Sequence, residues 1–436
     1  METEETIAVE LPKATMKRRR QMFRALSHRN YRLFWTGAFL SNIGTWMQAV
    51  AQGWLVLQLT DSPFWLGLDG FVALSPGLVL TLAGGVFADL VDRRRLILYT
   101  QAVAGAAALG LAVLISTNVI HKTGEFWSSH VWMILVFSFV TGCCMSLAGP
   151  SYQALTFDLV GREDVANAVA LNSTQFQLSR VVGPFFAGLG FKFFSLAGCF
   201  YANGISFVAV VMALAFVRFD GAGKAREDAH SVRDRRALWN DLLDGFRYVR
   251  NRPRVFTLLL ISAVNSLFGA PYLTFVPIFA RDIFHLGETG LALMMGTAGA
   301  GAFCGALVLA YLGDFKRKGS TVIGGAFAFG VCLIAFALAN HFYVSLIFLF
   351  GVGFSIVTSI AVVNTLLQQL VTDQMRGRVM SMFILSFIGT MPFGNLIAGV
   401  ASHRFGAPHT LAAGGCVVVL YATFVALSNK GLRELH

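Results

Sequence analysis

The sequence predicts an all-α membrane protein with twelve transmembrane helices, arranged as two six-helix pseudo-repeats. Of its 436 residues, 56% are hydrophobic and only 13% are charged, and the mean hydropathy is +0.66. A soluble chain could not bury so much apolar side chain, so the surrounding solvent is expected to be lipid. The apolar residues also gather in runs close to the roughly 20 residues that a helix needs to cross a bilayer.

Twelve apolar runs follow a polar N-terminal arm, and their even number is expected to place both termini on the same side of the membrane. The predicted spans cover about 33–58, 64–88, 96–117, 131–155, 165–190, 196–217, 255–280, 288–313, 320–340, 343–370, 379–402 and 409–429. The corresponding organisation is an arm at 1–32, a six-helix bundle at 33–217, a linker with an amphipathic helix at 218–254, a second bundle at 255–429 and a tail at 430–436.

Basic residues are distributed unevenly about these runs, and the net charge is +11. With the N-terminus inside, nearly all of the 34 Lys and Arg residues fall in the arm, the linker, the inner turns and the tail. Arg180 lies inside a span, and the four on the outer side are Lys122, Lys192, Arg281 and Arg404. This positive-inside pattern predicts a multi-pass protein of the cell (inner) membrane with both termini cytoplasmic. Because the basic surplus is a topology signal, nucleic-acid binding is not expected.

Cysteine and histidine usage gives no sign of a metal or cofactor site. The six Cys residues lie inside apolar runs without a CxxC pair, so we expect small apolar filler rather than disulfides or metal ligands. The nine His residues show no metal-ligand spacing, and the motifs HExxH, GxSxG and GxxxxGK[ST] do not occur. We therefore expect no cofactor, no metal and no enzymatic activity.

The two halves of the sequence resemble each other at one inner turn. A shift of 225 residues aligns Asp89 with Asp314 and sets the basic run 93–95 beside the basic run 316–318. An acidic residue next to a basic run at the same place in each half supports a six-plus-six parallel repeat.

The turn at 84–95 reads Gly-Gly-Val-Phe-Ala-Asp-Leu-Val-Asp-Arg-Arg-Arg. It resembles the signature Gly-x-x-x-Asp-Arg-x-x-Arg-Arg between the second and third helices of the major facilitator superfamily. Gly85, Asp89, Arg93 and Arg94 match, whereas Leu90 stands where the signature has its first Arg. The resemblance implies two six-helix bundles that rock around a central substrate site.

Further segments are similar to the enterobactin-exporter and macrolide-efflux branch, the drug:proton antiporter-3 group. The likeness runs from about residue 23 to 425 and includes Arg29-Asn-Tyr-Arg-Leu-Phe-Trp35, Gly44-Thr-Trp-Met-Gln48, Ala166-Asn-Ala-Val-Ala-Leu-Asn172 and Arg180-Val-Val-Gly-Pro184. It implies a monomeric exporter of small amphipathic molecules, such as drugs or a siderophore, with protons as a candidate partner besides the bilayer and the substrate. The alternatives are an importer or lipid mover of the same fold and, from another class, a polytopic membrane enzyme or sensor.

By this resemblance, the inner turns form a conformational latch. Asp89 is expected near the start of the eleventh helix, where exposed N–H groups favour an anion. Arg378 and the pair Arg93–Asp158 would complete an ion-pair network that holds the halves together when the outer side is open. The full expected set is Gly85, Asp89, Arg93, Arg94, Asp158, Asp314 and Arg378. The alternative is a group of solvated loop charges, for which an exposed pair contributes about 0–1 kcal/mol.

Two ionisable residues lie within predicted spans. Asp69 is about 30 Å of helix away from Asp89, which places it near the outer interface. Arg180 is about 22 Å into its helix from the inner face. A structural salt bridge between them that forms an outer gate, and a role in proton coupling, are both open interpretations.

Two motifs bear on the direction and energy source of transport. The antiporter pattern Arg-x-x-Gln-Gly does not occur in the fourth span, where Tyr152 precedes Gln153, and this weakens proton exchange as the energy source. Gly183-Pro184 matches the Gly-Pro of the exporter motif in the fifth span, with Ser179 in place of the upstream Gly. Pro permits a bend and small residues permit close packing, so the motif fits either a packing kink or a role in the direction of transport.

Polar but uncharged residues lie near the predicted midplane. In the superfamily, helices 1, 4, 7 and 10 line the cavity, so the candidate cavity residues, with Gln175 of the fifth span, are Trp46, Gln48, Cys144, Asn265, Tyr272, Thr358 and Asn364. Amides and aromatics among apolar walls suit an amphipathic or aromatic ligand better than a sugar or an anion. The alternative for each amide is a hydrogen bond to a neighbouring helix.

Overall fold

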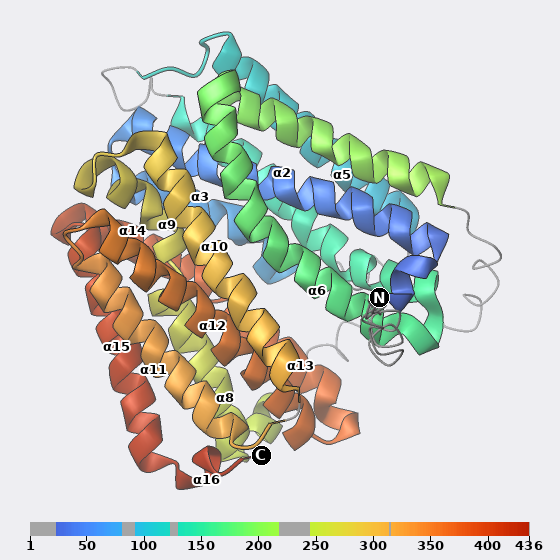
Figure 1. The fold of residues 1–436 in the computed structure, drawn as a ribbon, viewed down its shortest axis with the longest axis vertical. Helices are drawn as coiled ribbons and strands as arrows, with labels where there is room; N and C mark the ends of the chain where they lie inside the picture. The colour runs from blue at the N-terminus through green and yellow to red at the C-terminus, as the bar shows by residue number, and fades with distance from the viewer. Residues whose placement is uncertain (1–22, 81–91, 123–129, 218–244, 314, 436) are drawn as a thin grey trace, which may run out of the picture.

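The computed structural model describes residues 23–80, 92–122, 130–217, 245–313 and 315–435. All regular elements in these ranges are helices (Figure 1), which confirms the all-α class. The first half of the chain contains η1 (Arg24–Ser27), α2 (Arg29–Thr60), α3 (Pro63–Leu74), α5 (Arg93–Ser116) and α6 (Val131–Phe216). The second half contains α8 (Pro253–Val264), η3 (Asn265–Gly269), α9 (Tyr272–Ile278), η4 (Phe279–Ile283), α10 (Gly287–Leu312), α11 (Lys318–Ala337), α12 (Phe342–Leu370), α13 (Asp373–Phe387), α14 (Met391–Phe405), α15 (Ala407–Ser428) and α16 (Lys430–Arg433).

Nine helices within the described ranges are long and apolar enough to cross a membrane. One of them, the 86-residue α6, consists of three segments, because the backbone leaves the helical conformation at Gly161 (φ 72°) and Ser195 (φ 66°). A positive φ is easily adopted by Gly but strained for a residue with a Cβ. Hydrogen bonds then join the segments that flank each break, from Asn172 to Thr156 and from the Cys199 thiol to the carbonyl of Ala187.

Helices α2, α3, α5 and α6 pack together, and helices α8 to α15 form a second group (Figure 1). Within the second group, Gly301 of α10 and Gly353 of α12 permit a close approach. A Cβ on Gly301 would lie 2.0 Å from the carbonyl oxygen of Phe350, and one on Gly353 would lie 2.0 Å from that of Ala298. Small residues at such crossings are how helices associate in lipid, where burial of apolar surface gives no driving force.

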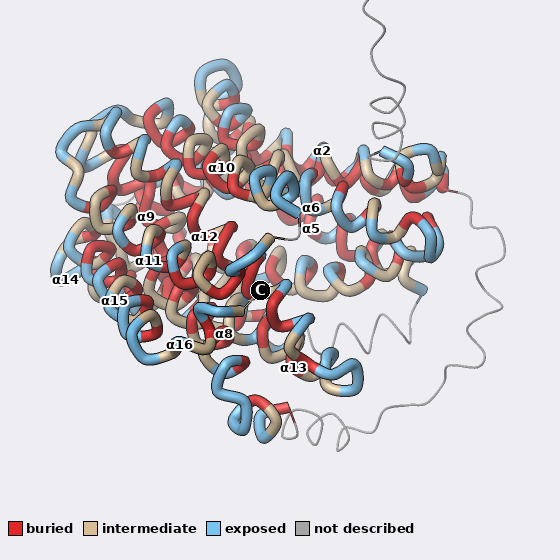
Figure 2. Tube along the Cα trace, turned by 60° about the horizontal axis from the view of Figure 1, so that its bottom comes forward, coloured by how far each residue is buried: buried red, intermediate tan, exposed pale blue. Residues whose placement is uncertain are grey.

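Buried residues lie along the faces where helices meet, and exposed residues lie at the periphery (Figure 2). The exposed residues include many large apolar side chains, such as Tyr311, Phe194 and Leu427, which are 91%, 73% and 74% exposed. A water-soluble surface rarely carries so many exposed apolar groups. The distribution fits a protein whose outer surface contacts acyl chains.

The stretch from α8 to η4 is an irregular helix. Two π-helical turns, η3 and η4, interrupt it, and their wide hydrogen bonds run from the N–H of Ala270 to the carbonyl of Asn265 and from Phe284 to Phe279. Pro271 and Pro277 lie in the same stretch, and Pro has no backbone N–H to donate. Such turns often occur at functional sites. Here η3 holds Asn265 within the second group, and α9, which carries Tyr272, contacts α2 and α3 of the first group.

Part of the predicted linker helix is also described. Residues 245–250 are helical, and Val249 is buried in the apolar core of the second group. A Cβ on Gly245 would lie 3.4 Å from the Cβ of Arg378 in α13. The described part of the linker therefore packs on the second group of helices.

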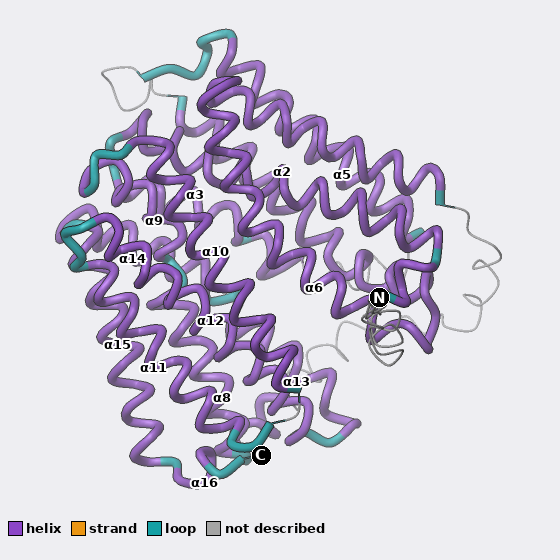
Figure 3. The backbone as a smooth tube through the Cα atoms, viewed as in Figure 1, coloured by secondary structure: helices purple, strands orange, loops and turns teal. Residues whose placement is uncertain are grey.

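The two groups of helices approach each other at one end and diverge toward the other (Figure 3). We call the first the Asp61 end and the second the Arg93 end. Near the Asp61 end, α3 and α14 meet through glycine, because a Cβ on Gly67 would lie 2.5 Å from the carbonyl oxygen of Asn395 and 2.7 Å from the Cα of Gly399.

Replacing Gly67 with Leu should therefore destabilise the arrangement in which the two groups of helices touch at the Asp61 end. The three atoms nearest to a Cβ at position 67 are backbone atoms of α14. Backbone atoms cannot move aside as a side chain can, so the overlap is relieved by separating α3 from α14. Overpacking costs about 1–3 kcal/mol, which is a roughly 5- to 150-fold change in an equilibrium. In a chain without native Cys, spin labels at the exposed Thr117 and His341, one in each half at the Asp61 end, should move apart.

The matched control is Gly324→Leu in α11, where a Cβ has no neighbour within 4 Å. It should leave the label distance unchanged. An unchanged distance in the Gly67 variant would show that this contact does not hold the two groups together.

Candidate functional site

Aromatic and cationic side chains gather where α2 and α6 meet α9 of the other half. The guanidinium carbon of Arg180 lies 5.2 Å from the centroid of the Trp46 ring, and the rings of Trp46 and Phe176 pack edge to face at 6.0 Å. The buried hydroxyl of Tyr272 has no hydrogen-bond partner among the described residues, and it lies close enough to Arg180 for the charge to act on it. We call these four residues the central cluster.

The exporter motif positions this cluster. Phe176, Arg180 and Gly183 follow one face of α6 at helical spacing. A Cβ on Gly183 would lie only 2.4 Å from the Cβ of Trp46, so Gly at this position lets α2 and α6 touch beside Arg180. The segment stays helical through Pro184, so the visible contribution of the motif in this structure is close packing.

The helical segment that carries Arg180 is longer than the predicted span. The predicted span covered 165–190, whereas the helical segment extends from the break at Gly161 to the break at Ser195. Arg180 lies near the middle of this segment. A carbonyl contact fixes its backbone between the halves, because a Cβ on Gly299 of α10 would lie 2.3 Å from the Arg180 oxygen.

Asp69 is held inside the first half and does not form the expected salt bridge with Arg180. Its two carboxylate oxygens accept from Gln52 Nε2 at 3.1 and 2.9 Å, and one of them accepts from Ser138 Oγ at 2.5 Å. Gln52 Nε2 also donates to Ser138 Oγ at 2.8 Å. Neutral donors from α2 and α6 therefore satisfy the buried carboxyl group. Arg180 contacts the aromatic ring of Trp46 instead.

Two of the predicted cavity residues serve packing in the first half. Gln48 accepts a 2.7 Å hydrogen bond from Asn203 Nδ2 across α2 and α6. Cys144 packs in a small apolar cluster with Ala104, Ala108 and Phe207. The cavity assignment of Cys144 is therefore corrected, because its face of α6 is directed at α5.

Two more predicted cavity residues bond within their own helix, α12. Thr358 Oγ1 donates to the carbonyl of Phe354 at 2.7 Å, and it would lie 3.0 Å from a Cβ on Gly305 of α10. Asn364 Oδ1 accepts from Gln368 Nε2 at 2.6 Å. Thr358 is thus a packing contact between α10 and α12, and Asn364 is half-buried.

Gln175 and Asn265 differ from the other predicted amides. They are 3% and 1% exposed, and Gln175 Nε2 and Asn265 Nδ2 have no hydrogen-bond partner among the described residues. A buried donor without an acceptor costs about 1–3 kcal/mol. These two amide groups lie on the helices that carry Arg180 and Tyr272.

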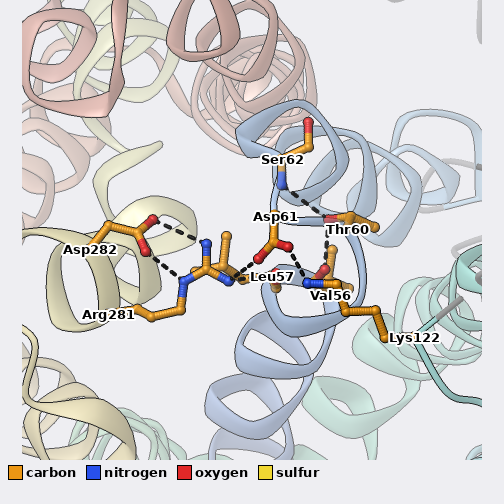
Figure 4. A network of polar contacts seen from close by, with 8 residues as sticks. All are labelled: Val56, Leu57, Thr60, Asp61, Ser62, Lys122, Arg281 and Asp282. Carbon is orange, nitrogen blue, oxygen red and sulfur yellow. Dashed lines mark hydrogen bonds and ion pairs between the residues drawn. The ribbon is translucent and has the colours of Figure 1, made fainter. Parts of the chain in front are cut away.

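An ion-pair network joins the two halves at the Asp61 end (Figure 4). Arg281 Nη1 donates to Asp61 Oδ1 at 2.7 Å and to the carbonyl of Leu57 at 2.8 Å, and its Nε donates to Asp282 at 2.6 Å. Lys122 pairs with the second oxygen of Asp61. Asp61 ends α2 with a left-handed backbone (φ 49°), which turns its carboxylate toward both cations.

This network was not predicted, although the sequence contains a usable signal for it. Arg281 and Lys122 are two of only four basic residues on the predicted outer side. Both contact Asp61, which follows the first predicted span. Basic residues that depart from the positive-inside pattern are therefore candidates for ion pairs. The sequence does not identify the partner, because Asp61 lies 220 residues before Arg281.

At the Arg93 end, ion pairs between described residues stay within one half. Arg93 Nη1 lies 2.8 Å from Asp158 Oδ2, and Arg376 Nη2 lies 2.6 Å from Asp373 Oδ1. Arg94 Nη2 donates to the carbonyl of Ala215 at 3.4 Å, and Arg378 Nη1 lies 3.4 Å from the sulfur of Met375. The other expected latch residues, Gly85, Asp89 and Asp314, lie outside the described residues.

The basic arm ends in a second charge cluster that was not predicted. Asp164 of α6 accepts from Arg24 Nε at 2.9 Å and from His28 Nε2 at 2.8 Å. Asn167 Oδ1 accepts from the backbone N–H of Ala25 at 2.9 Å. These contacts fix η1 to the second segment of α6 at the Arg93 end.

A family model described as transmembrane secretion effector matches residues 21–435. The chain belongs to this family of the major facilitator superfamily. The match spans all described elements and confirms the expected efflux branch, so the protein is a multi-pass membrane transporter.

Curated relatives of this chain cover nearly the same length. The staphyloferrin A transporter of Staphylococcus aureus is 23% identical over 405 residues, which is 92% of this chain and 96% of the relative. Macrolide efflux protein A of Streptococcus pyogenes is 20% identical with the same coverage. The multidrug efflux pump Tap of Mycolicibacterium fortuitum is 24% identical over 90% of each chain.

Solved structures support the fold alone. An inward-facing, occupied bacterial homologue of the lysosomal transporter Spinster superposes with a TM-score of 0.71 at 14% identity, covering 94% of this chain and 98% of the other. The inward-open xylose transporter XylE of E. coli gives a TM-score of 0.65 at 12% identity, covering 92% and 99%. Both are helical transporters, in agreement with the architecture described above.

Replacing Arg281 with Gln should loosen the Asp61 end. The variant loses the donors to Asp61 and Leu57, and because Asp61 is 53% exposed, the cost is about 1 kcal/mol, or roughly fivefold in the equilibrium. Spin labels at the Asp61 end should report a larger separated population. The control Arg404→Gln removes an exposed cation of the predicted outer side that has no ion pair among the described residues, and it should have no effect. Equal effects of both changes would contradict a specific bridge.

The Asp61 bridge should not respond to pH in the physiological range. The hydrogen bond from Lys122, followed by Arg281, holds the pKa of Asp61 below its ordinary value of 3.8. A carboxyl whose pKa is lowered by its partners contributes to closure above the ordinary pKa and loses this contribution as the pH falls through the lowered pKa. Label distances at the Asp61 end should therefore stay constant from about pH 8 to pH 5, and a lengthening near pH 6 would contradict this expectation.

Proposed function

We propose that this transporter exports small amphipathic molecules from the cytoplasm across the cell membrane by alternating access. The observation that carries the proposal is the central cluster, in which Trp46 and Arg180 come from the first half and Tyr272 from the second. A ligand held there contacts both halves, so its binding can favour one relative placement of the halves over another. Relatives named for a siderophore, for macrolides and for multiple drugs support a small amphipathic substrate.

We infer twelve crossings, six in each half. The three segments of α6 supply three of them, and the stretches Pro253–Ile283 and Asp373–Phe405 supply one each. The remaining crossings are α2, α3, α5, α10, α11, α12 and α15. The excess of Lys and Arg in the arm, linker and inner turns orients the Arg93 end and both termini toward the cytoplasm.

With this orientation, we infer that the arrangement described above is an inward-facing state. The Asp61–Arg281 bridge and the contact of Gly67 with α14 close the outer side. The inner pair Arg93–Asp158 stays within the first half. We propose that this pair joins Asp89 and Arg378 in a latch across the halves when the transporter faces outward, with Gly85, Arg94 and Asp314 in the same inner turns.

Asp69 is the candidate proton carrier. A buried carboxylate is costly unless it is hydrogen-bonded, and the partners of Asp69 are Gln52 and Ser138, which are both neutral. No cation stabilises its charge among the described residues. A group in this setting can release or take up a proton when movement of α2 against α3 changes its access to water.

Transport by purified protein in phospholipid vesicles tests both proposals. With an acidic lumen, radiolabelled erythromycin should accumulate above the level that this weak base reaches in protein-free vesicles, and the excess should disappear when a protonophore collapses the gradient. Asp69→Asn removes the titrating group while keeping its size, so gradient-driven accumulation should fall to the level of protein-free vesicles. Exchange of labelled for unlabelled substrate should persist in this variant, because exchange needs no net proton movement.

The matched control is Asp373→Asn, which changes an exposed carboxylate at the Arg93 end and should retain accumulation. Full accumulation by the Asp69 variant would show that Asp69 does not carry the proton. Intact cells decide the direction of transport: expression should lower cellular ethidium, whereas an increase would indicate an importer.

A further inference from the structure

Arg180 is a permanent positive charge in the middle of a membrane-spanning segment. A guanidinium stays protonated in proteins, and a charged side chain at the bilayer centre is costly unless it faces a partner or a water-filled cavity. Among the described residues, Arg180 has no carboxylate partner, since its neighbours are the face of Trp46 and the hydroxyl of Tyr272. The buried acid of the first half, Asp69, is already saturated by Gln52 and Ser138.

A cation–π contact lowers the cost of this charge without neutralising it. The contact with Trp46 contributes about 0.5–2 kcal/mol, and it occupies one face of the planar guanidinium. The N–H groups at its edge are the donors that pair with a carboxylate in a two-pronged arrangement. Arg180 is half-buried rather than buried, so part of its side chain remains accessible to a ligand.

Other donors on the same two helices also lack acceptors. Gln175 Nε2, on the segment that carries Arg180, and Asn265 Nδ2, on the stretch that carries Tyr272, are buried without a hydrogen-bond partner among the described residues. The helices that form the central cluster therefore carry a positive charge and N–H donors that have no acceptor among the described residues. A ligand that supplies an acceptor would complement Arg180.

We propose that Arg180 binds an anionic group, such as a carboxylate, on the transported molecule, and that the aromatic rings of Trp46 and Phe176 hold its apolar body. Tyr272 adds a hydroxyl from the second half, so the anion contacts both halves at once. This inference rests on the proposed function, and it adds that the site prefers amphipathic molecules that carry an anionic group over neutral or cationic ones. It also revises the expectation, drawn from uncharged polar residues, that the site disfavours an anion.

Two probes with the same aromatic body and opposite charge test the proposal by binding. Pyrenebutyrate carries a carboxylate, and pyrenebutyltrimethylammonium carries a quaternary cation. Equilibrium dialysis against purified transporter in nanodiscs, corrected with empty nanodiscs, should show that wild-type protein binds the anion at least about tenfold more tightly than the cation. Equal affinities, or tighter binding of the cation, would overturn the proposal.

Variants then identify the residue. Arg180→Gln should lower the affinity for the anion by about tenfold or more and should leave the affinity for the cation equal or higher. Arg180→Lys keeps the positive charge but loses the paired N–H donors of the guanidinium, so its affinity for the anion should be intermediate. The control is Lys192→Gln, which removes another cation of α6, one that lies 5.4 Å from the exposed ring of Phe193, and it should change neither affinity. Anion affinity that survives in both Arg180 variants would overturn the proposal.

Binding and transport separate this inference from the proposed function. If vesicles move erythromycin but the protein shows no preference for the anion, the exporter proposal stands and the anion site is wrong. If the anion binds through Arg180 but wild-type protein moves no substrate in vesicles, the anion site stands and the exporter proposal is wrong.

Discussion

In hydrocarbon, a polar or charged group must find its partner within the protein, and this constraint accounts for the arrangement of the molecule. Asp69 is surrounded by the neutral donors Gln52 and Ser138. Arg180 lies on an aromatic face instead of against an acid. Charge pairs lie at the two ends, where Asp61 meets Arg281 and where Arg93 meets Asp158. Arg180, which has no acidic partner among the described residues, is thus the unusual charge, and we propose that a transported molecule binds there.

Glycine sets how closely the helices that carry these groups can approach. Gly183 brings α6 against Trp46, and Gly299 brings α10 against the backbone of Arg180. The same device brings α3 against α14 at Gly67 near the closed end. A contact made by backbone atoms cannot deform gradually, so helices joined in this way either touch or separate. Such contacts suit a protein that alternates between two placements of rigid bundles.

The sequence predicted the helices well, because apolar runs and basic turns depend on residues near one another in the chain. It also singled out Asp69 and Arg180 as ionisable groups inside spans. Their partners could not be predicted, because they depend on how each helix is rotated about its axis and on which distant helices pack against it. Spacing along one helix did not reveal that Cys144 faces α5, or that Arg281 reaches a carboxylate 220 residues away. The longer second segment of α6, which moves Arg180 to its middle, depends on the backbone breaks at Gly161 and Ser195.

Paired distances at both ends of the wild-type protein test most directly whether the two bundles move as rigid bodies about the central cluster. One spin-label pair, Thr117 and His341, spans the Asp61 end, and a second, at the exposed positions Arg162 and Gly377, spans the Arg93 end. We expect a short first distance and a long second distance without substrate, and opposite changes in the two when the conformational equilibrium is shifted by substrate or by a pH gradient. Distances that lengthen together, or a change at one end alone, would contradict alternating access around Trp46, Arg180 and Tyr272.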